Sequence, residues 1–246
     1  MTSIITPSYN SARFIDIMIK SVLNQTYKNW ELIIVDDCSR DSSIEIIESY
    51  AKQDSRIHLI TLENNSGPAI ARNIAIEKAQ GKYIAFLDSD DIWISNKLEK
   101  QINFMESKQI SFSFSSYQII NEDGKYLKTF YIKESKINYF DLLKTNSIGC
   151  LTAIYNQHTL GKIYMPIIKK RQDYGLWLKI LKKVDYAYGI QEPLAKYRIH
   201  KNSISANKLK ASQYQWKIYR EVEKFNILKS IYYFVQYAYY GFMKYK

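Results

Sequence analysis

The sequence predicts an α/β protein in which helices flank a mostly parallel, Rossmann-like sheet and a helical tail follows at the C-terminus. In residues 1–100, short β-branched segments alternate with segments of helical period, the pattern of a parallel sheet covered by helices. Polar clusters follow the strand candidates, and the end of the chain is rich in lysine and aromatic residues. The expected strands are residues 3–6, 31–36, 57–62 and 82–87.

Each of the first three strands is followed by a segment with helical signals. Between the first two strands, apolar residues recur at three- and four-residue spacing and form one helical face. The second helix is expected to begin at Ser42, where Glu45 completes a capping box. The third is expected to begin at Pro68, with Gly81 closing it. Further helices are expected near residues 98–105 and 171–183, a turn at 121–124, a strand at 194–199, and one or two amphipathic helices after residue 205.

Composition and charge limit the classes of function. With 246 residues, 46% hydrophobic and 24% charged, the chain is expected to be globular. Its net charge of +11, concentrated in the tail, indicates an anionic partner: nucleic acid, a phosphorylated ligand or an acidic membrane surface. No basic region followed by an apolar run opens the chain, and Cys38 and Cys150 do not form a disulfide framework. We therefore expect a cytoplasmic protein.

Acidic residues gather where predicted strands end. Asp36 and Asp37 end the second strand, and Asp88, Asp90 and Asp91 end the fourth. The carboxyl ends of parallel strands share one edge, where ligands bind. Carboxylates this close repel one another unless a cation lies among them, and Mg²⁺ or Mn²⁺ is usually held by one or two carboxylates plus substrate phosphates. The pattern predicts a metal–diphosphate site, with a helix cap or a solvated acidic turn as the alternative for any single cluster.

Six motifs together resemble the family 2 glycosyltransferases, a family with the GT-A fold that inverts anomeric configuration. They are SIITPSYN (3–10), VDDCSRDSS (35–43), SGPAIARN (66–73), GKYIAFLDSDD (81–91), RQDYGLWLKIL (171–181) and YRIHKNSIS (197–205). The resemblance implies a catalytic domain over residues 1–205, with a nucleotide-sugar-binding half at 1–92 and an acceptor-binding half at 93–205. Residues 206–246 form a basic, aromatic helical tail outside the resemblance.

The resemblance also implies a nucleotide site. Pro7 and Tyr9 would form part of the wall around uracil, with the Tyr9 ring stacked on the base. Asp37, with Asp36 as the close alternative, would accept a hydrogen bond from the uracil N–H. Arg72 would approach the donor diphosphate.

The remaining implied roles concern the metal and the chemistry. Asp88 would lie at the ribose or in the metal shell, Asp90 would ligate Mn²⁺ or Mg²⁺, and His200 would lie near the metal and diphosphate. Asp173 would be the general base, since inverting transfer needs a carboxylate that takes the proton of the attacking hydroxyl. The alternative for Asp173 is a helix N-cap, and for His200 a surface histidine. Many relatives carry Glu where Gln172 stands, which questions a second acidic partner for the acceptor.

The composition of the tail indicates where the acceptor could be bound. Residues 231–243 are too short and too rich in hydroxyls to span a bilayer, but their Tyr side chains and the neighbouring lysines suit an anionic membrane surface. Packing against the catalytic domain or a second subunit is the alternative. We expect peripheral binding at the inner face of the plasma membrane.

The expected activity is metal-dependent, inverting transfer of a single hexose, glucose or galactose, from a UDP-sugar to a saccharide acceptor. By resemblance, that acceptor is carried on a polyprenyl diphosphate of the GlcNAc type in bacterial O-antigen or capsule biosynthesis. The other classes considered are a nucleotidyltransferase acting on sugar phosphates and a non-enzymatic lipid- or nucleic-acid-binding module. No glycine- and lysine-rich phosphate loop follows the first strand, which disfavours the former, and a binding module leaves the acids unexplained. We expect no nucleic acid partner.

Overall fold

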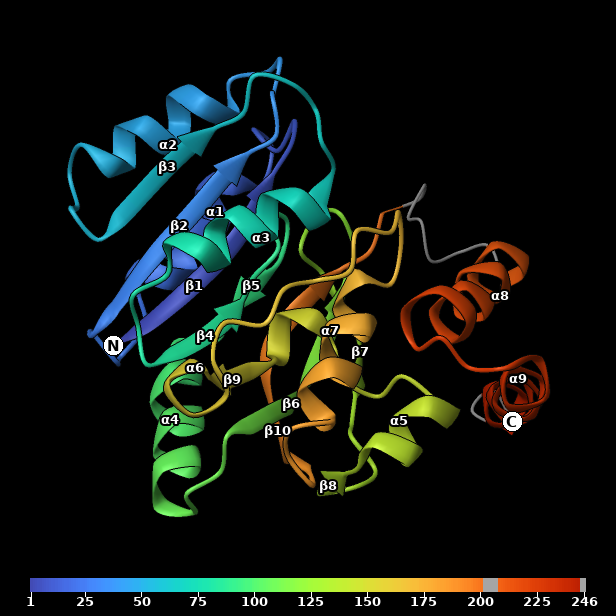
Figure 1. The fold of residues 1–246 in the computed structure, drawn as a ribbon. Coiled ribbons are helices and arrows are strands. Elements are labelled where there is room, and N and C mark those ends of the chain that lie inside the picture. The colour runs from blue at the N-terminus through green and yellow to red at the C-terminus, as the bar shows by residue number, and fades with distance from the viewer. Residues whose placement is uncertain (201–207, 244–246) are drawn as a thin grey trace.

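The computed structural model describes residues 1–200 and 208–243, which form an α/β fold around one sheet (Figure 1). The sheet has the strand order β3-β2-β1-β4-β9-β6-β10-β5, with β7 paired to β6 and β8 to β10. Its first four strands run parallel and confirm the predicted ones. They are β1 (Thr2–Ser8), β2 (Trp30–Asp36), β3 (Ile57–Thr61) and β4 (Tyr83–Phe86).

The helices between these strands are α1 (Ile15–Leu23), α2 (Ser43–Ala51) and α3 (Pro68–Lys78). Pro68 begins α3, as predicted. The predicted capping box is wrong, because Ser42 occupies the N-cap position of α2 without a side-chain hydrogen bond. Gly81 does not close α3, which ends three residues earlier. It lies instead so close to β1 that a Cβ would meet the Ser3 amide nitrogen at 2.7 Å.

The second half of the chain widens the sheet with strands of both directions. β9 runs antiparallel between β4 and β6, while β10 runs parallel to β6. The predicted helices and the turn at 121–124 are confirmed, and the predicted last strand is twice as long as expected. The elements are β5 (Ile92–Trp93), α4 (Lys97–Ser107), β6 (Phe112–Ile120), β7 (Tyr126–Phe130), β8 (Lys136–Ile137), α5 (Tyr139–Lys144), β9 (Ile154–Asn156), α6 (Gln157–Leu160), α7 (Gln172–Leu181) and β10 (Ala187–Arg198).

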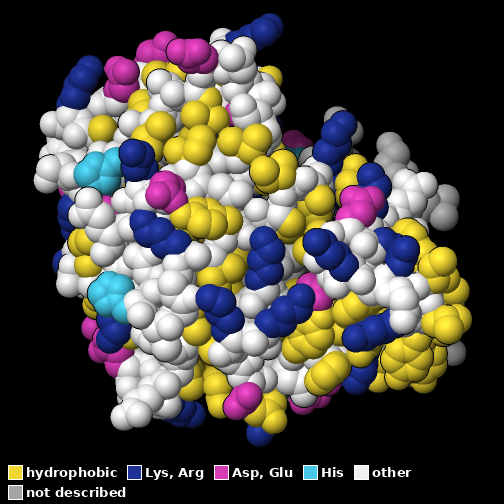
Figure 2. Space-filling model, viewed as in Figure 1, with side chains coloured by type: hydrophobic (Ala, Val, Ile, Leu, Met, Phe, Trp, Pro, Cys, Tyr) yellow, Lys and Arg dark blue, Asp and Glu magenta, His cyan; other side chains and the backbone are white. Residues whose placement is uncertain are grey.

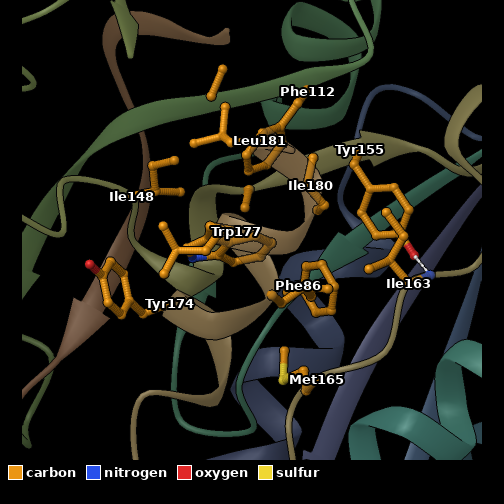
Figure 3. Packing of buried hydrophobic residues seen from close by; sticks show 14 of the residues in the cluster. Phe86, Phe112, Ile148, Tyr155, Ile163, Met165, Tyr174, Trp177, Ile180 and Leu181 are labelled. Atoms are coloured by element: carbon orange, nitrogen blue, oxygen red, sulfur yellow. Dashed lines mark hydrogen bonds between the residues drawn. The ribbon is translucent and has the colours of Figure 1, made fainter. Parts of the chain in front are cut away.

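Two apolar clusters cover the two faces of the sheet. Successive residues of β1 alternate between them: Ile4 packs with α1 and α4, and Ile5 with α3 and α7. This alternation is the two-residue period of a strand. On the α7 face, Trp177 packs edge-on against Phe86 at 5.3 Å between ring centroids and lies 5.4 Å from Phe112 (Figure 3). The middle of α7 is thereby anchored over the carboxyl end of β4.

The tail folds onto the α7 face. It consists of α8 (Lys208–Lys217), a π-helical turn (Ile218–Val222) and α9 (Ile227–Met243), at the right of Figure 1. Tyr219 is fully buried, and its hydroxyl donates to the Leu143 carbonyl at 2.6 Å. The inner face of the tail therefore packs against the catalytic domain, which was the alternative to membrane binding. In the part of the chain that the structure describes, no helix combines the length and apolar character of a membrane span.

Candidate active site

The loops after β1 and β2 are joined through Asp36. This buried carboxylate accepts hydrogen bonds from the Ser8 hydroxyl at 2.9 Å and from the Ser39 amide and hydroxyl at 2.8 and 2.6 Å. The Asn10 amide donates to the Ser39 hydroxyl at 2.9 Å. The Tyr9 side chain projects from this loop and is 49% exposed, so its ring is open to a stacking partner. Its predicted partner, uracil, stays a prediction.

Asp37 ties the end of β2 to the start of α3. Its two oxygens accept from the backbone amides of Ser66 and Gly67 at 2.7 and 2.8 Å, and the residue is 3% exposed. Gly67 has a φ of 89°, in the region that favours glycine. A carboxylate oxygen can accept more than one hydrogen bond, so these contacts leave room for the predicted bond from a nucleobase. They also give Asp37 a structural task that the sequence did not indicate.

Arg72 lies between Asp88 and helix α7. One terminal nitrogen of its guanidinium is 2.5 Å from the Asp88 carboxylate, and the other donates to the Gln172 side-chain oxygen at 3.1 Å. Burial disfavours its charge, but the attraction of Asp88, together with smaller contributions from Cys150 and Asp173, raises the pKa of Arg72. Its Nε, also buried, has no hydrogen-bond partner among the described residues. The side chain therefore bridges two halves of the site, and its predicted approach to a diphosphate stays a prediction.

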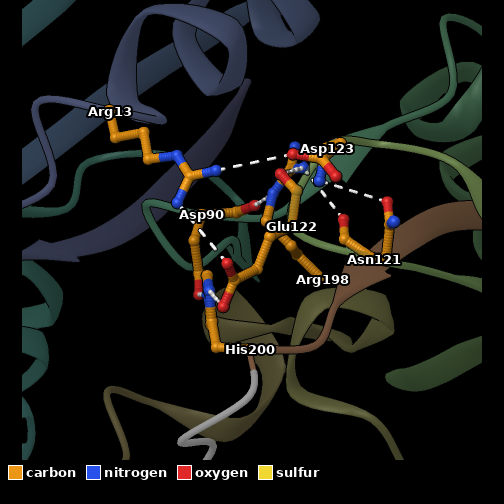
Figure 4. A network of polar contacts seen from close by, with 7 residues as sticks. All are labelled: Arg13, Asp90, Asn121, Glu122, Asp123, Arg198 and His200. Atoms are coloured by element: carbon orange, nitrogen blue, oxygen red, sulfur yellow. Dashed lines mark hydrogen bonds and ion pairs between the residues drawn. The ribbon is translucent and has the colours of Figure 1, made fainter.

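Asp90 pairs with His200 across the end of the sheet. The His200 Nε2 lies 2.7 Å from the Asp90 carboxylate, and both side chains are partly exposed (Figure 4). Burial and the neighbouring Asp88 charge raise the pKa of Asp90, and His200 opposes that shift. Lys201 and the rest of the last motif to Ser205 lie outside the described residues.

Asp91 has a different task from the other two acids of its motif. It is buried, and its carboxylate accepts from the Arg198 backbone amide at 2.8 Å. The Arg198 side chain in turn donates to the backbone carbonyls of Asp90 and Glu122 at 2.8 Å each. These bonds fasten β10, which leads to His200, to the loop that carries Asp90.

Asp173 lies in the first turn of α7 and is partly exposed. The N-cap position is Arg171, so the alternative that Asp173 caps the helix is wrong. Burial is the main cause that raises the pKa of Asp173; the Arg72 charge opposes it and the Asp88 charge adds to it. The Asp173 carboxylate thus has a raised proton affinity and lies beside the Arg72–Asp88 pair. Such a carboxylate can take a proton from a hydroxyl.

A comparison of sequences identifies the family. The profile described as "Glycosyl transferase family 2" matches residues 3–161, which contain the first four motifs and both sets of strand-end acids. The chain belongs to the family 2 glycosyltransferases. It therefore has the GT-A architecture that the resemblance implied, and it is an enzyme of glycosyl transfer.

Relatives of this glycosyltransferase match nearly its whole length. TuaG of Bacillus subtilis is 49% identical over 97% of this chain and 94% of the relative. The UDP-Glc:alpha-D-GlcNAc-diphosphoundecaprenol beta-1,3-glucosyltransferase WfgD of Escherichia coli is 44% identical over 99% of this chain and 94% of the relative. Among solved structures, S. aureus TarS in complex with UDP-GlcNAc superposes with a TM-score of 0.74 at 21% identity, covering 96% of this chain and 71% of that one.

Two site-lining residues of the glycosyltransferase were not predicted. Glu122, in the turn between β6 and β7, places a carboxylate oxygen 3.7 Å from the His200 Nδ1. Arg13, from the loop after β1, lies 3.5 Å from Glu122 and 3.6 Å from Asp123 and so spans the two halves of the site (Figure 4). The sequence around Glu122 indicates only a turn, because nothing local shows that the turn folds over the Asp90 loop.

Proposed function

We propose that this family 2 enzyme transfers glucose from UDP-glucose, with inversion, to an N-acetylglucosamine carried on a polyprenyl diphosphate. The observation that carries the proposal is the 44% identity over 99% of the chain to WfgD, whose name states that reaction. The matched region covers the acceptor-side residues as well as the donor motifs. In this proposal residues 1–92 hold the donor, residues 93–205 complete the acceptor site, and the product belongs to bacterial surface polysaccharide.

Asp173 is the proposed base. Its carboxylate takes the proton of the acceptor hydroxyl while that oxygen bonds to the anomeric carbon of glucose, and the bond from that carbon to UDP breaks with its electron pair. Attack opposite the leaving group inverts the configuration. The raised pKa of Asp173 supports this role, because a stronger base removes the hydroxyl proton more readily. Tyr9, Pro7, Asp36 and Asp37 hold the nucleotide in this proposal.

The donor set at Asp90 and His200 fits Mn²⁺ or Mg²⁺. The Asp90 carboxylate and His200 imidazole lie at the carboxyl end of the sheet, and the crowding of Asp88 against Asp90 raises a pKa that a cation would lower again. Among the described residues, no group of three or more His, Cys, Asp or Glu side chains could hold a metal ion by itself. In this proposal, substrate phosphates complete the coordination of the cation. When bound, it would neutralise charge on the departing diphosphate.

The outer face of α9 supports peripheral binding to an anionic membrane. Leu228, Ile231, Tyr232 and Val235 recur at three- and four-residue spacing and are 80%, 46%, 56% and 58% exposed. Apolar side chains gather over this helix, with lysines and arginines around them, at the right of Figure 2. This pairing of apolar and cationic side chains suits a leaflet of acidic lipid that presents the acceptor. The tail lysines Lys244 and Lys246 lie outside the described residues.

Radiolabelled UDP-glucose tests the proposed function. The purified enzyme, with Mn²⁺ and synthetic GlcNAc-diphospho-polyprenol, should form a labelled disaccharide lipid and release UDP only when the acceptor is present. UDP-galactose and UDP-GlcNAc serve as competing donors, and the anomeric configuration of the product is read by NMR. Preferred transfer from either competing donor would overturn the choice of glucose, and transfer only to lipid-free saccharides would overturn the acceptor.

A further inference from the structure

Arg171 holds an unusual backbone position two residues before the proposed base. Its φ of 62° and ψ of 30° lie in the left-handed region, which a residue with a side chain occupies at a cost. Its carbonyl accepts from the Gly175 amide at 3.1 Å and so begins the first turn of α7. Gln172 and Asp173 follow at once, so the conformation of Arg171 sets where that turn starts and where the Asp173 carboxylate points.

The side chain of Arg171 is held by the tail. One guanidinium nitrogen donates to the Gln215 side-chain oxygen on α8, and the other donates to the Tyr237 hydroxyl on α9 at 2.6 Å. The guanidinium carbon also lies 5.0 Å from the centre of the Tyr237 ring, within the range of a cation–π contact. The Arg171 side chain, at the N-cap of α7, therefore contacts both tail helices.

Buried residues support the contacts between Arg171 and the tail. Gln215 is fully buried, and its amide nitrogen donates to the Tyr174 hydroxyl at 3.1 Å. That hydroxyl donates to the Leu142 carbonyl at 3.0 Å. Gln215, one of the two partners of Arg171, is thus fixed by its own contacts, and a residue in a strained backbone region persists only where its surroundings hold it.

We propose that Arg171 is a positioning residue through which α8 and α9 hold the Asp173 carboxylate for proton transfer. The inference rests on the proposed role of Asp173. It assigns the tail a part in catalysis that is separate from membrane binding: the inward side of α9 sets the base, and the outward side faces lipid. A tail that merely stabilises the fold would lower the melting temperature without a specific loss of turnover.

Tyr237→Phe is the sharpest test, because it keeps the ring and removes only the oxygen that accepts from Arg171. Misplacement of a reacting group by about 1 Å can cost about 100-fold in rate, so kcat should fall between roughly 10-fold and 100-fold. The KM for UDP-glucose should stay within about twofold, since no donor contact is touched. Tyr240→Phe, which removes an exposed hydroxyl from the same helix, is the control and should leave kcat unchanged.

Coupling is measured by a double-mutant cycle. If the two side chains act as one unit, Tyr237→Phe should cause little further loss of kcat in an Arg171→Ala background. Arg171→Lys, which retains the charge but not the two-pronged geometry, should recover only part of the activity. Additive losses in the cycle, or full activity of Arg171→Lys, would overturn the proposal.

Hydrogen exchange gives a readout that needs no substrate. Amides 172–176 should exchange faster in Tyr237→Phe than in the wild type or Tyr240→Phe, at temperatures where all three remain folded. Unchanged exchange and unchanged kcat would overturn the positioning role, as would a fall in kcat that only follows the fraction unfolded. If exchange and kcat respond as expected but another donor or acceptor is preferred, the proposed substrates fail while the positioning role stands.

Discussion

At the scale of single residues, Asp173 combines the two properties that a general base needs. The residue is partly exposed, so an acceptor hydroxyl can reach it, and its surroundings raise its pKa. Asp91 has a raised pKa too, mainly through burial, but its carboxylate is buried and engaged by the Arg198 backbone amide. Asp173 and Asp91 both have a raised pKa, so exposure to solvent is what distinguishes the candidate base from the structural acid.

Asp173→Asn should reduce kcat by roughly 100-fold to 10,000-fold, the range that a positioned base contributes. The amide keeps the size of the side chain but does not take a proton at neutral pH. Affinity for UDP-glucose, measured by calorimetry with Mn²⁺, should change little. Asp185→Asn, at an exposed aspartate after α7, is the matched control. Turnover of Asp173→Asn within a few-fold of the wild type would remove this residue as the base.

The pH dependence of turnover should reveal the same group. Only the ionised carboxylate accepts a proton, so kcat should fall as pH drops through the pKa of Asp173. Because burial raises that pKa, the acid limb should lie above the ordinary aspartate value of about 3.9. Raising the Mn²⁺ concentration tenfold should leave this limb in place, whereas a limb caused by protonation of Asp90, the proposed metal ligand, would move to lower pH.

Asp90→Ala should abolish transfer and remove the part of the UDP-induced rise in melting temperature that depends on Mn²⁺. The reason is that the diphosphate loses the cation through which it is held. Thermal shift with UDP alone, Mn²⁺ alone and both together measures this. Asp123→Ala, at an exposed acid in the neighbouring turn, should retain the synergy. Near-normal activity of Asp90→Ala in EDTA-treated buffer would contradict the metal assignment.

At the scale of elements, the donor half was predictable and the acceptor half only in part. The first four strands carry local signals, namely short segments of apolar and β-branched residues, and the second and fourth end in acids. β9 does not, because its three residues become a strand only through antiparallel pairing with β4 and β6. β10 was expected to begin at residue 194. It begins earlier because residues 187–190 also pair with neighbouring strands, and its register against β6 shifts on both sides of Pro193. Such shifts depend on the partner strand and leave no local pattern.

The same limit applied to side chains of the site. Asp88 and Asp173 lie in separate motifs of the sequence. Nothing in those motifs indicates that Arg72 bonds both to Asp88 and to Gln172, the residue before Asp173. The departure from Glu at Gln172 becomes intelligible here, since a neutral side chain can accept from Arg72 while its amide donates to the Ile168 carbonyl. Only the approach of α3 to α7 in space brings these groups within hydrogen-bonding distance.

The outer face of α9 provides a prediction for an element. Leu228→Glu or Val235→Glu should weaken binding to vesicles of phosphatidylglycerol and phosphatidylcholine by about tenfold or more, because burying such a side chain contributes roughly 1.5–3 kcal/mol. Melting temperature should be unchanged, since both side chains are exposed. Leu127→Glu, on the exposed surface of β7, is the control. Equal vesicle binding by all three variants would contradict a lipid-facing α9.

At the scale of the whole molecule, the buried charge of Lys97 should shape stability. This lysine begins α4 and is fully buried; its amine lies 2.9 Å from the Gln101 side-chain oxygen and 4.2 Å from the centre of the Trp93 ring. Burial lowers its pKa well below the ordinary value. The sequence does not indicate this burial, because a lysine at a helix start is normally solvated.

The sign of its effect follows from proton binding. The unfolded chain keeps the Lys97 proton up to about pH 10.4, whereas the folded chain releases it at lower pH. Between the two pKa values the unfolded state binds more protons, so the free energy of unfolding should rise with pH. One proton corresponds to about 1.4 kcal/mol per pH unit. The penalty of keeping Lys97 buried is therefore largest at low pH and is relieved as pH approaches 10.

Urea unfolding of Lys97→Met between pH 7 and 9 tests this. The stability of the variant relative to the wild type should decline with rising pH by up to about 1.4 kcal/mol per unit, because only the wild type gains from losing the proton. Taking the difference between the two proteins cancels the titration of tyrosines and Cys150, which they share. Lys108→Met, at an exposed lysine that follows the same helix, should run parallel to the wild type. If Lys97→Met also ran parallel, Lys97 would remain protonated in the folded chain, and its amine would have to be stabilised by more than Gln101 and the Trp93 ring.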